Sequence, residues 1–316
     1  MRRENLIVQV LDSSHAKWVQ GGVFKDLRNA SNAFGNQPIY LPPLNSIQNF
    51  VIWFLRSWSL RSYSVLLFSS LTPLENFLRF PLQKKKQKLG LWYTHKDGEY
   101  SNQEKAALRR ANVIFAHSKN EIKKVREVSQ SLFVEMLAGI DPERFSEPSI
   151  SGSEILWAGT PVHRKNPELF LSITKASQEF NFRLIGSGWM ESEFASAVLS
   201  SPNLKYVEFQ GPLKSQDMDG CGIFLMTSRL EGGPMPLLES LASGLVPICT
   251  KTGFVEELYQ LLELPNELLV EPDVNSFISA IKWVRERNFV ISESQRLKIL
   301  ELNFQRLSTI IESNLI

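Results

Sequence analysis

The sequence contains few residues of the kinds that build disulfide frameworks or metal centres. Its 316 residues include two cysteines and four histidines, and none of these has a spacing typical of a metal site. Both cysteines, Cys221 and Cys249, lie in apolar runs, which predicts reduced, buried thiols. We therefore expect neither disulfides nor a bound metal.

A long uninterrupted apolar run is also missing. The most apolar stretch, FVIWFLRSW at 50–58, is broken by Arg56 and is shorter than the roughly 20 residues that a membrane-spanning helix needs. The N-terminal stretch MRRENLIVQVLDSS shows no small-residue cleavage pattern after its short apolar run. These features predict a cytoplasmic protein.

The composition is that of a globular protein, with 43% hydrophobic and 22% charged residues. The charges are unevenly distributed: 1–150 carries 21 Lys and Arg against 13 Asp and Glu, and 151–316 carries 14 against 20. This asymmetry suggests two modules. The basic half suits an anionic membrane surface or an acidic partner.

Strand-like and helix-like segments alternate along both halves, which predicts an α/β fold with parallel sheets. A stretch rich in Pro, Ser and Gly at 139–153 reads as a linker between them. We predict two Rossmann-like doubly wound domains, at 1–145 and 150–290, followed by a helical tail at 291–316. Ligands bind beyond the carboxyl ends of such strands, so we expect the ligand in a cleft between the two domains. The expected strands are 5–11, 64–70, 88–94, 112–118, 132–138, 154–160, 181–187, 204–211, 222–228 and 245–250.

Two loops of the second half follow predicted strands. GTPVHRKN at 159–166 carries Arg164 and Lys165 at a strand-to-helix turn, where cations suit a diphosphate; solvated loop charges are the alternative. Gly186 opens GSG, which permits close backbone approach or forms an ordinary turn. The first strand is not followed by GxGxxG, which argues against a nicotinamide dehydrogenase.

The segment EGGPMPLLE at 231–239 places Glu231 in a loop and Glu239, by prediction, in the first turn of a helix. Gly232 and Gly233 permit unusual backbone angles between them. Carboxylates accept hydrogen bonds from paired hydroxyls, so the two acids suit ribose and hexose rings with a diphosphate between, as in a nucleotide-sugar. An exposed loop carboxylate and a helix-end charge are the alternatives.

These segments resemble, in order, the donor domain of retaining GT-B glycosyltransferases of family 4. The matching motifs are GIDPERF, WAGTPVHRKNPELFL, LIGSGWMESEF, VEFQGPL, EGGPMPLLE, TGFVEEL and LLVEPDVNSFISAI. The resemblance implies that the donor diphosphate contacts the loop with Arg164 and Lys165, although Thr160 stands where many members have arginine. It also implies that Glu231 lies near the transferred sugar and that Glu239 holds the ribose. Donor contacts are further implied for Gly159, Gly186, Gly232 and Gly233.

The first half resembles this family more loosely. GGVFKDL, with Gly21 and Gly22, resembles the glycine loop near the donor phosphates, and GLWYTHKDGE resembles the segment carrying an active-site histidine, here His95. A polar loop residue is the alternative for His95. The half is short for this fold.

The resemblance thus implies a metal-independent, retaining glycosyltransferase that moves a sugar from a nucleotide-sugar to a glycan, lipid-linked or other hydroxyl acceptor. No cofactor beyond the donor and no nucleic acid is expected, and polysaccharide biosynthesis is a family-level expectation. The alternatives are a nucleotide-sugar epimerase of the same fold and a non-catalytic glycosyltransferase-like subunit.

Two further segments leave alternatives open. FVIWFLRSWSLRSYS at 50–64, with KKKQK at 84–88, is either an interfacial patch that holds the protein peripherally at the inner face of a membrane or an amphipathic core helix. DMD at 217–219 looks like the metal motif of another glycosyltransferase fold, but solvated helix charges are the better interpretation.

Overall fold

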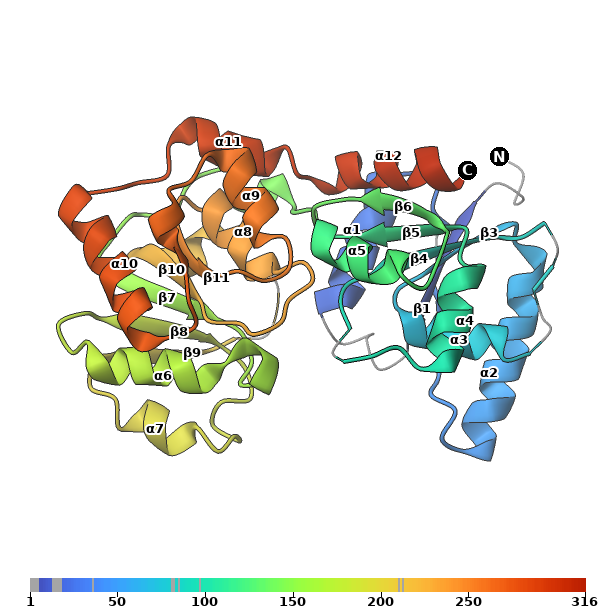
Figure 1. The fold of residues 1–316 in the computed structure, drawn as a ribbon, viewed down its shortest axis with the longest axis horizontal. Helices are drawn as coiled ribbons and strands as arrows, with labels where there is room; N and C mark the ends of the chain where they lie inside the picture. The colour runs from blue at the N-terminus through green and yellow to red at the C-terminus, as the bar shows by residue number, and fades with distance from the viewer. Residues whose placement is uncertain are drawn as a thin grey trace. The chain divides into compact units, whose positions relative to one another are not determined.

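The computed structural model describes residues 6–12, 19–35, 37–80, 83–84, 86–96, 98–209, 211 and 213–316 (Figure 1). The chain divides into two compact units. The first comprises Met1–Gly139 and Phe304–Ile316, and the second comprises Ile140–Asn303.

The first unit is built on a six-stranded sheet in the order β2-β1-β3-β4-β5-β6, in which all paired strands are parallel. Its inner strands are apolar and buried on both faces, as expected when helices cover both sides of a parallel sheet. The strands are β1 (Ile7–Asp12), β2 (Ile39–Leu41), β3 (Val65–Phe68), β4 (Lys88–Tyr93), β5 (Val113–Ala116) and β6 (Leu132–Glu135), and the helices are α1 (Val19–Ala30), α2 (Ile47–Ser59), α3 (Leu71–Leu78), α4 (Asn102–Arg110), α5 (Lys119–Arg126) and α12 (Phe304–Leu315).

The second unit repeats this architecture with the strand order β12-β11-β10-β7-β8-β9, again parallel throughout. The central strands β7 and β10 are neighbours, so the loops that follow them lie side by side. The strands are β7 (Glu154–Ala158), β8 (Phe182–Gly186), β9 (Leu204–Glu208), β10 (Cys221–Met226), β11 (Val246–Thr250) and β12 (Leu269–Val270), and the helices are α6 (Pro167–Ala176), α7 (Ala195–Leu199), α8 (Met235–Ala242), α9 (Val255–Leu262), α10 (Val274–Arg287) and α11 (Glu293–Leu300).

The α/β fold class with two doubly wound units is confirmed. The predicted tail at 291–316 is divided between the units, because α11 belongs to the second and α12 to the first. The apolar stripe of α12 includes Leu307 and Ile311 and packs into the core of the first unit. At Gly90 in β4, a Cβ atom would lie 2.9 Å from a methyl group of Leu315, so the helix approaches the sheet closely. The sequence analysis also overlooked β2, α9 and β12.

Both cysteines are buried and unpaired, as predicted. Burial raises the pKa of the Cys221 thiol to about 11 and that of Cys249 to about 12. Neither thiol is therefore ionised at neutral pH.

Candidate active site

The loops after β7 and β10 form one hydrogen-bonded assembly at the carboxyl ends of their strands. The Thr227 hydroxyl donates to the Lys165 carbonyl at 2.9 Å and accepts from the Trp157 indole at 3.0 Å. The Arg229 amide donates to the Arg164 carbonyl at 2.8 Å. These bonds hold the cationic loop against the segment that leads to Glu231.

The local backbone turns Lys165 into the protein. His163–Lys165 form a single 3-10 turn, and Asn166 ends it with a left-handed backbone (φ 55°, ψ 56°). Pro167 then opens α6, where its missing N–H needs no partner. As a result the Lys165 side chain is buried, whereas that of Arg164 keeps 40% of its surface exposed.

Glu231 is the centre of an ion cluster. Its Oε1 lies 2.6 Å from Lys165 Nζ, and its Oε2 lies 2.9 Å from Arg164 Nη1. The Ser228 hydroxyl donates to Oε1 at 2.9 Å, and the Glu231 amide donates to the Thr252 hydroxyl, also at 2.9 Å. Two cations and one carboxylate leave a net charge of about +1, which suits an anionic ligand.

The protonation state of Glu231 follows from these contacts. Burial alone would raise the pKa of its carboxyl, but the charges of Lys165 and Arg164 lower it by more. Glu231 is therefore ionised at neutral pH although it is buried. The sequence alternative of an exposed loop carboxylate is wrong for this residue.

Glu239 has the opposite balance. Burial raises the pKa of its carboxyl to about 7; Asp217 adds to the rise, and Arg144 opposes it. The Arg144 guanidinium lies 3.9 Å away, at the limit of an ion pair. Helix α8 begins at Met235, so Glu239 lies in its second turn and the predicted first-turn position is wrong. Pro236 is accommodated in the first turn of this helix, where its missing N–H needs no partner.

The glycines of the site allow close backbone packing. At Gly186, the last residue of β8, a Cβ atom would lie 1.9 Å from the Gly159 carbonyl oxygen, which also accepts from the Trp189 indole at 2.9 Å. Gly253 (φ +60°) similarly brings the loop after β11 against the Gly232 carbonyl. Gly233 follows and leads into α8 through Pro234.

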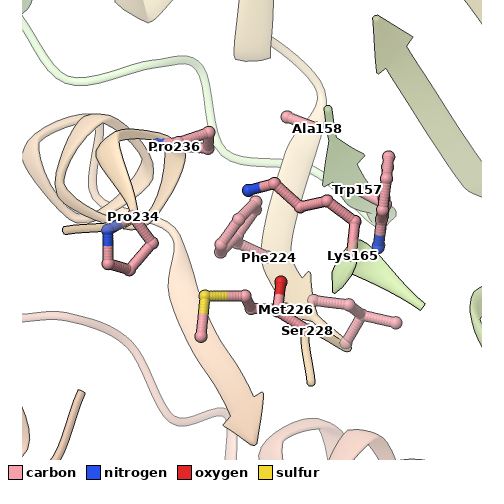
Figure 2. Close-up of a pocket in the computed structure, with 9 residues that line it drawn as sticks. Trp157, Ala158, Lys165, Phe224, Met226, Ser228, Pro234 and Pro236 are labelled. Carbon is pink, nitrogen blue, oxygen red and sulfur yellow. The ribbon is translucent and has the colours of Figure 1, made fainter. Parts of the chain in front are cut away.

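A small cavity of about 10 Å³ lies beside Lys165, which is close to the minimum for one water molecule. Figure 2 shows the Lys165 side chain directed from its loop toward the start of α8, where Pro234 and Pro236 lie. Trp157, Ala158, Phe224, Met226 and Ser228 also line this cavity.

The other predicted site residues belong to the first unit. His95 follows β4, is partly buried, and lines a pocket of about 240 Å³ with Ser70, Thr72 and Thr94. An ion pair of 2.7 Å between Lys96 and Glu104 forms part of the same wall. Gly21 and Gly22 lie inside α1, which begins at Val19, so the expected glycine loop is part of a helix. Within the second unit, the predicted residues that the structure brings into one ion cluster are Arg164, Lys165 and Glu231.

Two other groups have structural roles. His117 is buried, its Nδ1 lies 2.9 Å from the Met136 carbonyl, and burial lowers its pKa to about 4. Within DMD, Asp217 accepts from the Lys214 amide and Asp219 from the Ile150 amide. Among the described residues, no three His, Cys, Asp or Glu side chains are grouped as metal ligands.

Ser228 and Thr252 contact Glu231 but were not singled out in the sequence analysis. Each follows a strand of the second sheet, β10 and β11 respectively. The strand-end rule that drew attention to Arg164 and Lys165 applies equally to them. In the described part of the chain, no helix has both the length and the apolar character needed to cross a membrane.

Comparison with known proteins identifies a family for part of the chain. Residues 143–298 match the model of the family described as Glycosyl transferases group 1. A search of curated protein sequences found no match.

The fold is shared with solved glycosyltransferase structures. Sucrose-phosphate synthase from Thermosynechococcus elongatus aligns with a TM-score of 0.74 and 16% identity over 98% of both chains. AviGT4, a glycosyltransferase involved in avilamycin A biosynthesis, aligns with a TM-score of 0.65 and 11% identity over 98% of this chain and 96% of that one. An E. coli trehalose-6-phosphate protein bound with UDP-2-fluoro glucose aligns with a TM-score of 0.61 and 8% identity over 95% and 83%.

The alignments cover nearly all of this chain and nearly all of each of the first two structures. The expectation of a shortened N-terminal half stays a prediction. The group 1 domain at 143–298 contains the cationic loop, Glu231 and Glu239. Residues 143–298 are thus a group 1 glycosyltransferase domain, and the chain with its two doubly wound units has the GT-B fold.

Proposed function

We propose that this glycosyltransferase takes its sugar from a nucleotide-sugar bound to the second unit and transfers it with retention. The observation that carries the proposal is the ion cluster of buried Lys165 and Glu231 with half-exposed Arg164, whose net charge of about +1 lies at the carboxyl ends of β7 and β10. A nucleoside diphosphate is an anion whose phosphate oxygens can accept charge-assisted hydrogen bonds from such cations. One structural neighbour is bound with UDP-2-fluoro glucose, which is consistent with this donor class.

In this proposal the two cations contact the diphosphate and Glu231 contacts the transferred sugar. Lys165 and Arg164 are held on Glu231 in the free protein, so the ligand shares cations that are already oriented. As the diphosphate leaves, they neutralise the charge that develops on it. This role requires no metal ion, and no cofactor other than the donor is proposed.

Glu239 is assigned the ribose. It lies on α8 in the segment that follows Glu231, and its carboxylate oxygens can accept hydrogen bonds from two neighbouring hydroxyls. Gly159, Gly186, Gly232 and Gly233 would let the backbone approach the donor. The absence of arginine at Thr160 is offset by Arg164, which is already in the cluster.

The first unit is assigned the acceptor, a glycan, a lipid-linked sugar or another hydroxyl compound, with His95 beside it. Its pocket carries hydroxyl, cationic and carboxylate side chains, which suit a polar acceptor. A cytoplasmic role in polysaccharide biosynthesis is part of the proposal.

A thermal-shift screen with UDP-, GDP-, ADP- and dTDP-sugars tests the donor, because a ligand of the native state raises its melting temperature. The stabilising donor is then incubated with sugar acceptors, and the anomeric configuration of the product is read by NMR. Transfer with retention supports the proposal. Conversion of the donor sugar without an acceptor would identify an epimerase, and failure of every donor to bind would identify a non-catalytic subunit.

A further inference from the structure

Helix α2 carries the largest group of exposed apolar side chains in the described part of the chain. Six of the thirteen large exposed hydrophobic residues lie on this single helix of 13 residues. The most exposed are Ile47 at 86% and Leu55 at 64%, and Trp58 keeps 54% of its surface. The others are Phe50, Val51 and Phe54.

These six side chains form one face. At about 100° per residue they fall within an arc of about 140°. Trp53 and Ser57, on the side of the helix next to Phe50, are buried against the rest of the first unit. Figure 1 shows α2 at the periphery of that unit. The exposed apolar face therefore does not belong to the core. The predicted core helix is found only in part, because the side with Trp53 and Ser57 is buried while the apolar face is exposed.

The exposed rings form a continuous row. Phe54 lies between Phe50 and Trp58, with centroid distances of 6.4 Å and 6.0 Å. Phe80 packs against Phe50 and Trp53 from outside the helix, at 5.8 Å and 4.9 Å. This packing holds the aromatic ridge in place without covering it.

The chain segment that contains the ridge is rich in cations. Between positions 47 and 88 the sequence has seven Lys and Arg and one acidic residue, Glu75. The Arg61 guanidinium lies 4.6 Å from the centre of the Trp58 ring. The Gln87 side chain donates to the carbonyls of Leu60 and Tyr63, which brings the lysine segment beside the end of α2. Lys84 and Lys86 in that segment are exposed.

We propose that this face, Ile47 to Trp58 with the cations around it, is a docking surface for an anionic lipid bilayer. Aromatic and aliphatic side chains on one helical face enter the boundary between headgroups and acyl chains, and nearby cations are attracted to acidic headgroups. A second copy of this chain fits less well, because it would bring another basic region to the same interface. The proposal does not depend on the donor site, so either one can fail while the other stands.

Sedimentation with vesicles tests the surface. The full-length protein is mixed with vesicles of phosphatidylcholine alone or with 30% phosphatidylglycerol, without a nucleotide-sugar. We expect binding to the anionic vesicles to be at least tenfold stronger, and to weaken between about 50 and 500 mM salt because exposed charges are screened. The triple variant Val51→Asn, Leu55→Asn, Trp58→Asn should lose at least tenfold in affinity.

A matched control carries Leu199→Asn, Val290→Asn and Leu297→Asn, which replace exposed apolar side chains of the second unit. It should bind as the unchanged protein does. The charge variant Lys84→Glu, Lys86→Glu keeps the apolar face and should lose several-fold at low salt only. Circular dichroism and melting curves verify that all variants fold.

Three results would overturn the proposal: no binding of the unchanged protein to anionic vesicles, equal binding by the triple variant, or equal loss in the control. Sedimentation velocity provides a fourth. If the α2 face drives self-association that the triple variant abolishes, and vesicles do not compete, the face is a subunit interface.

Discussion

Glu231 and Glu239 are two buried glutamates of one loop-and-helix segment, yet their carboxyl groups respond to burial in opposite ways. The nearest cations lie at 2.6 and 2.9 Å from Glu231 but at 3.9 Å from Glu239. Coulomb attraction and hydrogen bonding both weaken as the distance between carboxylate and cation increases. The pKa of Glu231 is therefore lowered, while that of Glu239 is raised to about 7. Burial does not by itself decide whether an acid is charged; the distance to the nearest cation does.

The sharpest test of this contrast is Glu231→Gln. We expect the rate of transfer to fall by about a thousandfold or more, as when a preorganised charge is removed from a reaction centre. The variant leaves Lys165 buried without its carboxylate, so stability should also fall by about 1–3 kcal/mol. Turnover with the identified donor and a melting curve measure the two effects.

Glu168→Gln is the control, because Glu168 forms an exposed 3.7 Å pair with Arg229. Removal of such a surface pair costs about 0–1 kcal/mol and should leave the rate unchanged. Unaltered transfer by Glu231→Gln would contradict the role assigned to this residue.

Glu239→Gln tests the other half of the comparison through the pH dependence of stability. The folded-state pKa of Glu239 is raised from 4.5 to about 7, so protonation of this group favours folding. That contribution is complete below about pH 4.5 and is lost as the pH rises through about 7. The free energy of unfolding of the variant, minus that of the unchanged protein, should therefore rise by on the order of 3 kcal/mol from pH 5 to pH 8.

Denaturant unfolding at both pH values measures this gain. Glu231→Gln should show the reverse trend in a more acidic range, between about pH 5 and pH 3. The lowered pKa of Glu231 contributes stability that is complete above the ordinary value of 4.5 and is lost as the pH falls toward the folded-state pKa. The same sign in both variants would refute the contrast.

Lys165→Ala should weaken the binding of a nucleoside diphosphate by about 10- to 100-fold, because a buried charge-assisted contact contributes roughly 1.5–3 kcal/mol. Calorimetry with UDP, GDP and ADP measures it. Lys175, at the exposed end of α6, provides the control: Lys175→Ala should bind normally. Equal affinities of both variants would remove Lys165 from the phosphate site.

Arg164→Ala should have the smallest effect, a loss of about threefold in the same titration. Its side chain is 40% exposed, and solvent screens its charge. A loss of affinity larger than that of Lys165→Ala would contradict this prediction. It would show that side-chain exposure in the free protein does not determine which cation contributes more to binding.

The alternation of strands and helices could be predicted from the sequence because buried parallel strands are short apolar runs between helical patterns. β2 and β12 were missed because they have three and two residues, too few for a recognisable pattern. The ion cluster was only partly predictable. Strand ends indicate Arg164, Lys165 and Glu231, but the depth of Lys165 depends on the left-handed turn at Asn166.

The unit against which α12 packs could not be predicted from the sequence either. Its apolar stripe predicts a buried face but does not say which unit it packs against. The pKa of Glu239 was equally inaccessible, because it depends on Arg144 and Asp217, which are distant in sequence.

The path of the chain through α12 makes the first unit discontinuous. Phe304, Leu307, Ile311 and Leu315 fill part of the core formed with β4 and β5, so a fragment ending at Gly139 would lack a wedge of its own interior. Such a fragment should be insoluble alone and rescued by a synthetic peptide spanning 304–316. Helix α12 thus completes the core of the first unit from the far end of the chain. We therefore expect the first unit to finish folding only after the second has been synthesised.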